Sequence, residues 1–99
     1  MARKQLQNLS EPMYYVLLSL RSPLHGYGIM QYIKELTKGR VAVGAGTLYS
    51  LLARFEKEEI IKQIPVEDNK KVYVLTDKGR EVLDKEIIRL YQLVEDSTL

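Results

Sequence analysis

The sequence predicts a mainly α-helical domain with a small β-hairpin and a long last helix. Before residue 58, apolar residues recur in three stretches at the spacing of a helix face that packs on a core. Between residues 60 and 75 this pattern gives way to β-branched residues on either side of a turn. Past Gly79 no helix-breaking residue interrupts the chain up to about Asp96.

The composition is that of one globular domain. The chain has 99 residues, of which 45% are hydrophobic and 28% are charged. It contains no cysteine, which excludes a disulfide scaffold, a zinc–cysteine site and a thiol nucleophile. The sequence shows neither a signal peptide nor an apolar run of about 18 residues, so we expect a cytoplasmic protein with no membrane partner.

Charge is unevenly distributed along the chain. The net charge is +2, yet residues 1–76 hold 11 Lys and Arg against 7 Asp and Glu, whereas residues 77–99 hold 4 against 6. Arg3 and Lys4 add to the basic side within a polar N-terminal arm. A basic body with a mildly acidic tail is compatible with a polyanion bound on one face.

The first helix is predicted from Ser10 to about Leu20. Ser10 is a favourable N-cap, and Glu11 and Pro12 suit the first helical turn. Because this helix is apolar around most of its girth, we expect one side to face the core and another to face a partner subunit. The apolar stripe consists of Met13, Val16, Leu17 and Leu20, widened by Tyr14 and Leu18.

A second helix is predicted from His25 to about Thr37, followed by a turn. Its apolar positions repeat the same stripe, and Gly39 is well placed for the left-handed conformation that closes a helix. His25 is the only histidine, so a metal site is not expected and we assign it a structural or capping role. A third helix after a short glycine-containing turn gives a helix-turn-helix arrangement.

The third helix, from Val43 to Lys57, is the candidate reading head for DNA. Its core face carries Leu48, Leu51, Leu52 and Phe55. Small side chains on the opposite face allow close approach to a groove, and the basic ones supply donors for phosphates or guanine edges. An ordinary solvated amphipathic helix is the alternative interpretation of this stretch. The outer face consists of Gly46, Ser50, Ala53, Arg54 and Lys57.

A two-stranded hairpin follows. The strands are predicted at 60–66 and 71–75, with Pro65 confining one end to a sheet edge. Asp68 and Asn69 suit the positive-φ positions of a tight turn. Since an isolated hairpin is too small to be stable, Tyr73 and Leu75 are expected to pack on the helices.

The last helix is predicted from a cap at Thr76 to about Asp96. Its apolar residues recur at intervals of four, three and four, which is typical of a coiled-coil seam. Because the seam is too short to hold alone, we expect it to pack on the first helix of a second subunit; packing on its own core is the alternative. The predicted dimerisation residues are Leu83, Ile87, Leu90, Tyr91 and Val94 on this helix, with Tyr14 and Leu18 on the first.

Together these elements constitute a winged helix-turn-helix domain over residues 1–76 and a dimerisation helix over residues 77–99, in one structural unit. Three sequence blocks then resemble a known family. They are His25-Gly26-Tyr27-Gly28-Ile29, Gly46-Thr47-Leu48-Tyr49 followed by Leu52, Phe55 and Glu56, and Tyr73-Val74-Leu75-Thr76-Asp77-Lys78-Gly79. In their order and spacing the chain resembles the PadR family of bacterial transcriptional regulators, specifically the short subgroup with one C-terminal helix.

The resemblance implies a homodimer that binds an inverted repeat in a promoter and represses transcription, with a small-molecule effector releasing it in some members. By matching position, Thr47, Tyr49, Ser50 and Arg54 would meet DNA in the major groove. Tyr27 would approach a phosphate, and Lys70 and Lys71 would be contacts of the wing. Lys57, Lys70, Lys71, Arg3 and Lys4 are expected to neutralise phosphates.

The sequence departs from the family in two places. Glu59 stands where members usually have glycine, and if the backbone there needs positive φ, glutamate costs roughly 1 kcal/mol or more. The wing lacks the Gly- and Arg-rich tip common in the family. The chain also has no tryptophan, so the paired tryptophans that stack on flat drugs in some relatives are absent.

Other features of the sequence have simpler interpretations. The acidic residues Glu56, Glu58 and Glu59 are most simply a solvated helix end, and residues 44–46 lack the lysine and length of a phosphate loop. No nucleophile, metal set or acid–base pair supports an enzyme, and no cofactor is expected. Tyr14, Tyr15 and Tyr91 either line an effector pocket at the dimer interface or belong to the core. A winged-helix module that binds protein without specific DNA binding remains the alternative function.

Overall fold

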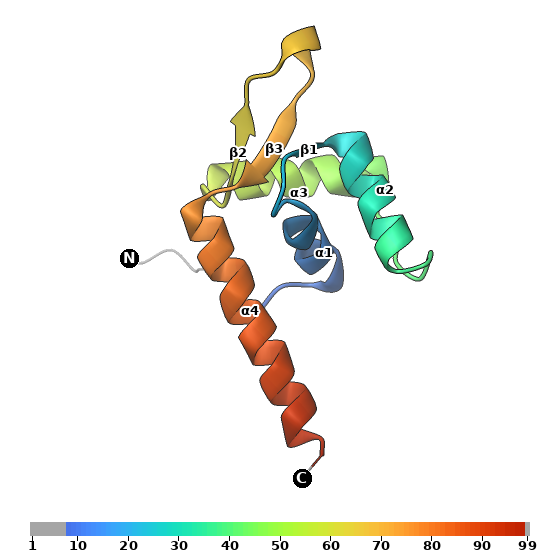
Figure 1. Cartoon of the computed structure of the whole chain (residues 1–99), viewed down its shortest axis with the longest axis vertical. Coiled ribbons are helices and arrows are strands. Elements are labelled where there is room, and N and C mark those ends of the chain that lie inside the picture. The colour runs from blue at the N-terminus through green and yellow to red at the C-terminus, as the bar shows by residue number, and fades with distance from the viewer. Residues whose placement is uncertain (1–7, 99) are drawn as a thin grey trace.

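The structure, a computed structural model, describes residues 8–98 of the chain. It consists of the helices α1 (Glu11–Ser19), α2 (Gly26–Leu36), α3 (Ala45–Lys57) and α4 (Asp77–Asp96) and the strands β1 (Leu24–His25), β2 (Ile61–Ile64) and β3 (Val72–Leu75). The three shorter helices gather around one core, β2 and β3 project from it as a wing, and α4 runs away from the other elements toward the C-terminus (Figure 1). This mainly helical fold confirms the predicted class.

The helix starts follow from local chemistry. Ser10 caps α1 by accepting a hydrogen bond from the backbone N–H of Met13 at 3.4 Å, as predicted. Thr76 caps α4 in the same way by accepting from the N–H of Gly79 at 3.0 Å. By contrast, α2 and α3 begin without a side-chain cap, so the first backbone N–H groups of both helices lack this partner.

The core lies between α1, α2, α3 and the inner face of the sheet. Its largest fully buried side chains include Phe55, Leu17, Leu20, Ile29, Ile33, Leu48 and Leu52. The predicted contacts of Tyr73 and Leu75 with the helices are confirmed, since both side chains are 3% exposed within the same cluster. The hairpin is therefore anchored at its base on the helical core.

The sheet has three antiparallel strands in the order β1-β3-β2, not the two that the sequence predicts. β1 pairs Leu24 with Tyr73 and His25 with Val72. A two-residue strand directly after Pro23 has no periodic pattern that could predict it. The turn is also longer than predicted, because residues 65–71 separate the strands and include a 3-10 turn at Glu67–Asn69, although Asp68 does adopt a positive φ of 71°.

Two junctions depend on unusual backbone. After α3, Glu59 has φ 63°, so a glutamate adopts a conformation that favours glycine. After α2, Gly39 has φ 78°, as predicted, and Lys38 beside it has φ 53°.

At the start of α4, Gly79 packs so closely on the backbone carbonyl of Ile60 that a Cβ would collide with it. This close contact sets how near α4 lies to the segment between α3 and β2.

No helix within residues 8–98 is both long enough and apolar enough to cross a membrane.

Candidate nucleic-acid interface

Helix α3 presents one buried face and one exposed face. Leu48, Leu52 and Phe55 are at most 1% exposed and fix the helix on the core. Thr47, Ser50, Arg54 and Lys57 are all exposed. No side chain lies over Gly46, because an added Cβ there would have no neighbour within 4 Å. The exposed face thus combines small side chains with two cations, as the sequence predicts.

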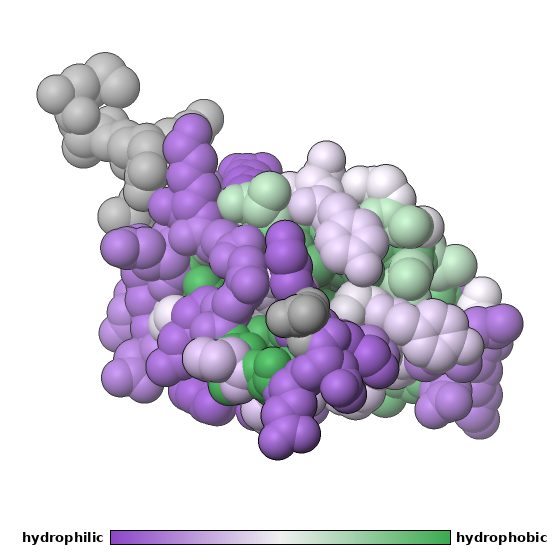
Figure 2. Space-filling model, turned by 90° about the horizontal axis from the view of Figure 1, so that it is seen from above, coloured by the Kyte–Doolittle hydropathy of each residue, from purple (hydrophilic) through white to green (hydrophobic). Residues whose placement is uncertain are grey.

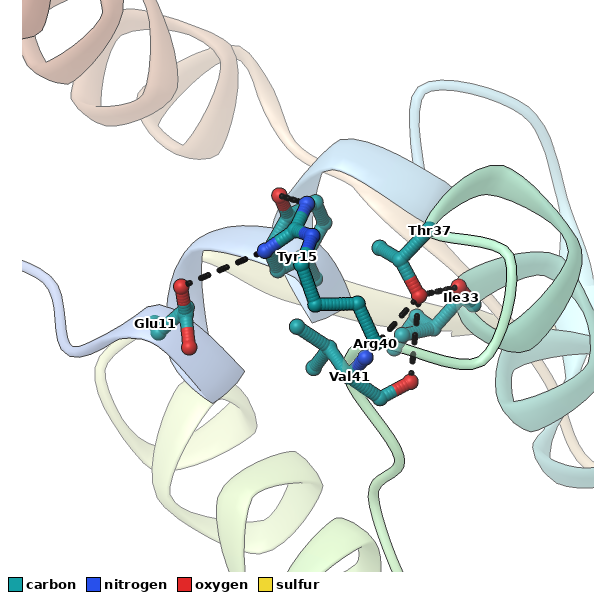
Figure 3. Close-up of polar contacts among 6 residues, drawn as sticks. All are labelled: Glu11, Tyr15, Ile33, Thr37, Arg40 and Val41. Carbon is teal, nitrogen blue, oxygen red and sulfur yellow. Dashed lines mark hydrogen bonds and ion pairs between the residues drawn. The ribbon is translucent and has the colours of Figure 1, made fainter.

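The turn between α2 and α3 is organised by Thr37, as Figure 3 shows. Its hydroxyl lies 2.8 Å from the carbonyl of Ile33 and 3.2 Å from that of Val41, and it accepts a hydrogen bond from the N–H of Val41 at 3.1 Å. Thr37 is buried, so these bonds are shielded from water. A single hydroxyl therefore joins the last turn of α2 to the segment that leads into α3.

Arg40 connects the same turn to α1. Its guanidinium donates a hydrogen bond to the Tyr15 hydroxyl at 3.2 Å and lies 3.8 Å from the Glu11 carboxylate (Figure 3). Both partners of the ion pair are more than 60% exposed, so it contributes little to stability. The sequence did not single out Thr37 or Arg40, because a short polar turn carries no periodicity.

Tyr49 lies on a flank of α3 and not at the centre of its exposed face. Its hydroxyl packs on Gly26, the first residue of α2, where a Cβ would overlap it. The side chain is nevertheless 51% exposed. Tyr49 therefore supports the junction of α2 and α3 with one edge and leaves the rest of its ring accessible.

Two acidic side chains border the exposed face of α3. The Arg54 Nε lies 3.4 Å from a carboxylate oxygen of Glu58, one turn later. On the other flank, Glu56 accepts a hydrogen bond from the Gln63 side chain of β2 at 2.9 Å. The two acids do not form one cluster, because each has its own partner. Paired acid–base chemistry finds no support in this geometry.

The start of α2 lies beside this face. Tyr27 is 62% exposed, which makes it accessible to a backbone phosphate. His25 occupies the N-cap position but makes no side-chain cap bond, and its ring packs beside Gly28. Within residues 8–98, no group of three His, Cys, Asp or Glu side chains could hold a metal ion.

The predicted wing cations lie between the turn and β3. Lys70 and Lys71 are both exposed and precede Val72, the first residue of β3. Seen from the wing end, hydrophilic side chains cover much of the surface, and paler and apolar ones gather toward one side (Figure 2). Arg3 and Lys4 lie outside the described residues.

A second surface, formed by α1 and the distal half of α4, is apolar. Tyr91 is 73% exposed and Val94 is 64% exposed, and with Tyr14, Ile87 and Leu90 they line a pocket of about 190 Å³. Leu18 on α1 is half-buried. Burial, with smaller effects of Tyr15 and other neighbours, raises the pKa of the Tyr14 hydroxyl above its ordinary value. Exposed apolar side chains gathered on one surface are typical of a site that a partner or a ligand covers.

Leu83 was predicted in this seam, and that prediction is wrong. It is 1% exposed and belongs to the chain's own core, so little of its surface remains for a partner. The periodicity of α4 is continuous, but the helix passes from intramolecular packing to an open surface as it leaves the core. Spacing alone cannot locate that transition.

Glu86 is a buried acid that the sequence did not mark. Its carboxylate accepts hydrogen bonds from Arg89 at 2.7 and 2.8 Å and from the backbone N–H of Leu9 at 3.2 Å. The hydrogen bonds from Arg89 lower the pKa of this carboxyl below its ordinary value, against the effect of burial. The sequence signal for this pair is an acid three residues before an arginine. The hydrogen bond from Leu9 to Glu86 also joins the N-terminal segment to α4.

Comparison with known proteins identifies the family that this chain matches. The family model described as "Transcriptional regulator PadR-like family" matches residues 16–85. A PadR-like transcription factor of Bacteroides fragilis is 29% identical, with a TM-score of 0.75 over 88% of this chain and 86% of that one. Bacillus subtilis PadR, solved in complex with operator DNA, is 29% identical, with a TM-score of 0.70 over 79% of this chain and 47% of that one.

A curated relative is much longer. An uncharacterized 37.1 kDa protein in transposon TN4556 of Streptomyces fradiae is 36% identical over 64 residues. The match covers 65% of this chain and only 18% of that protein.

Proposed function

Because the chain belongs to the PadR-like family of transcriptional regulators, we propose that it is a homodimeric repressor that binds a specific DNA sequence. The observation that carries the proposal is the exposed face of α3, which combines Thr47 and Ser50 with Arg54 and Lys57. An α-helix fits the major groove, where small polar and basic side chains reach base edges. The relative from Bacillus subtilis that was solved with operator DNA supports this assignment.

In the proposed complex, α3 lies in the major groove and its neighbours contact the backbone. Arg54 reads a guanine, for which its planar guanidinium is suited. Tyr27 and Tyr49 approach phosphates near the uncapped start of α2. Lys57, Lys70 and Lys71 neutralise further phosphates and make binding sensitive to salt.

Two copies bind one operator. The apolar surface around Tyr91 and Val94 exposes both side chains by more than 60%, which supports a partner subunit there. Because a two-fold dimer presents its two α3 helices symmetrically, the operator is an inverted repeat with half-sites about one helical turn apart. The pocket beside Tyr14 is the place for a small apolar effector that would change the dimer geometry.

Arg54→Ala tests this function against that of a protein-interaction module. We expect the variant to lose affinity for a duplex recovered from a randomised pool by the wild-type protein, by about five-fold or more. Arg80→Ala is the matched control, since Arg80 is an exposed cation of α4 outside the proposed interface. Sedimentation of both variants checks that the oligomer is unchanged. Equal affinity of Arg54→Ala and wild type would contradict the proposed recognition face.

A reporter measurement tests repression itself. We expect expression from a promoter that carries the recovered duplex to fall when the protein is supplied and to recover with Arg54→Ala. Unchanged or raised expression with the wild-type protein would contradict a repressor.

A further inference from the structure

The pair of Arg54 and Glu58 is not explained by stability. Glu58 follows directly after the last residue of α3, where the helix dipole disfavours a negative charge. Its basic partner precedes it by four residues, which is the less favourable orientation of such a pair on a helix. Half of the Arg54 side chain is exposed, so the ion pair adds little to the folded state.

The pair nevertheless places one edge of the guanidinium against an anchored residue. The Glu58 side chain is only 16% exposed, and its backbone carbonyl accepts a hydrogen bond from the Lys78 ammonium of α4 at 3.0 Å. Its backbone N–H donates to the Arg54 carbonyl at 3.1 Å. These bonds anchor the backbone of Glu58 at the junction of α3 and α4, and its carboxylate contacts the arginine at 3.4 Å through Nε.

Only one edge of the guanidinium is used by this contact. Within residues 8–98, neither terminal nitrogen of Arg54 has a hydrogen-bond partner, so these two nitrogens remain available as a planar fork. Two parallel donors on such a fork match the O6 and N7 acceptors of guanine. A side chain held by a neighbour loses less conformational entropy on binding than a free one.

The pair also separates specificity from general attraction. Glu58 offsets the positive charge of Arg54, so the pair as a whole attracts phosphates weakly. The gain from Arg54 then depends on hydrogen bonds to a correctly placed base. Lys57, the neighbouring cation on α3, has no acidic partner among the described residues and serves the backbone instead.

From these contacts we propose that Glu58 is a positioning residue that holds Arg54 for guanine recognition and thereby determines operator specificity. This inference rests on the proposed DNA-binding function. An acid repels DNA, so the charge of the surface alone would not predict a role for Glu58 in DNA recognition.

Selection of duplexes from a randomised pool tests the proposal with the full chain. We compare wild type, Arg54→Ala and Glu58→Ala, and we use Glu56→Ala as the matched control. Glutamine at position 58 would keep an oxygen that accepts from Arg54 Nε, so alanine is the variant that removes the contact. Glu56 is an acid of α3 whose partner is Gln63 and not an arginine. The control therefore removes one negative charge close to Glu58 without freeing Arg54.

We expect Arg54→Ala and Glu58→Ala to lose preference for guanine at the same position of each half-site, by about five-fold or more. Glu58→Ala should bind scrambled duplex as well as wild type or more tightly, because a negative charge has been removed. Glu56→Ala should keep the guanine preference. Combining Arg54→Ala with Glu58→Ala should reduce the preference no further than Arg54→Ala alone.

The outcomes distinguish this inference from the function on which it rests. If wild type enriches no sequence, the proposed function fails and the inference fails with it. If wild type enriches a motif whose guanine depends on Arg54 while Glu58→Ala keeps it in full, the positioning role is overturned and the function stands. Equal losses of specific and non-specific affinity in Glu58→Ala would indicate a structural role and would also overturn it.

Discussion

At the scale of single residues, Glu59 carries backbone strain that the rest of the chain maintains. Its φ of 63° lies in the left-handed region, where a side chain costs about 1–2 kcal/mol relative to glycine. The conformation is held because the N–H of Ile60 donates to the Phe55 carbonyl at 2.9 Å and the Thr76 hydroxyl donates to the Glu59 carbonyl at 2.7 Å. Glutamate at this position thus occupies a backbone conformation that favours glycine.

Glu59→Gly should therefore stabilise the protein. Relief of strain exceeds the added entropy of the unfolded chain, which costs about 0.4–1 kcal/mol, so we expect a net gain on the order of 0.5–1 kcal/mol in the free energy of unfolding. Urea denaturation followed by circular dichroism measures it. Glu67→Gly is the control, since Glu67 is an exposed acid without positive φ. A loss of stability in Glu59→Gly as large as in the control would contradict the strain.

Glu86 makes stability depend on acid. Its pKa is lowered in the folded protein by hydrogen bonds from Arg89, so its contribution is present above the pKa of the unfolded chain, about 4.3, and is lost as the pH falls below it. With Glu86→Gln, Tm should decline less steeply between about pH 5 and pH 3, the range around the pKa of the unfolded chain. The exposed Glu81 of the same helix provides the control variant Glu81→Gln. An equally steep decline in Glu86→Gln would refute this role.

At the scale of elements, a close neighbour leaves room only for glycine at some positions, whereas other glycines have space for a side chain. Gly79 brings α4 against the carbonyl of Ile60, whereas Gly46 in α3 has open space beside it. Gly79→Ala should lower the free energy of unfolding by about 1–3 kcal/mol through overpacking. Gly46→Ala, the control, should raise it by about 0.5–1 kcal/mol because alanine favours the helix. Thermal denaturation distinguishes them, and equal Tm values would contradict the close contact.

Most elements could be predicted from the sequence, because caps and periodicity are local. Ser10 and Thr76 mark two helix starts, and the stripes of α1, α2 and α3 mark their buried faces. β1 could not be predicted, since its two residues pair only through β3, far along the chain. The same limit applies to Tyr49 and Leu83 in the candidate sites, because the sequence does not show which elements their side chains meet. A helical wheel gives a side chain's direction, but the element that meets it is set by the tertiary fold.

At the scale of the whole molecule, α4 separates the two candidate surfaces. Its first turns belong to the core through Leu83, and its distal half projects beyond the other elements (Figure 1). The proposed dimer and DNA surfaces therefore lie on different parts of the chain. A change at the distal half should alter the oligomer without altering the exposed face of α3.

Val94→Glu should convert the proposed dimer to a monomer, because a charge would be buried against an apolar partner surface. Val94 is 64% exposed in the single chain, so the variant should keep its fold. Sedimentation velocity at micromolar concentration measures the change. Gln92→Glu adds a charge to another side of α4 and should remain dimeric. A wild-type monomer under these conditions would contradict the dimer.

The central claim, that α3 of this chain recognises a DNA sequence, is tested most directly by fluorescence anisotropy. The titration compares the duplex recovered from the randomised pool with a scrambled duplex of the same length and composition at one salt concentration. We expect the recovered duplex to bind at least about a thousand-fold more tightly, as specific regulators do, and both affinities to fall as salt rises. Equal affinity for the two duplexes would contradict the claim.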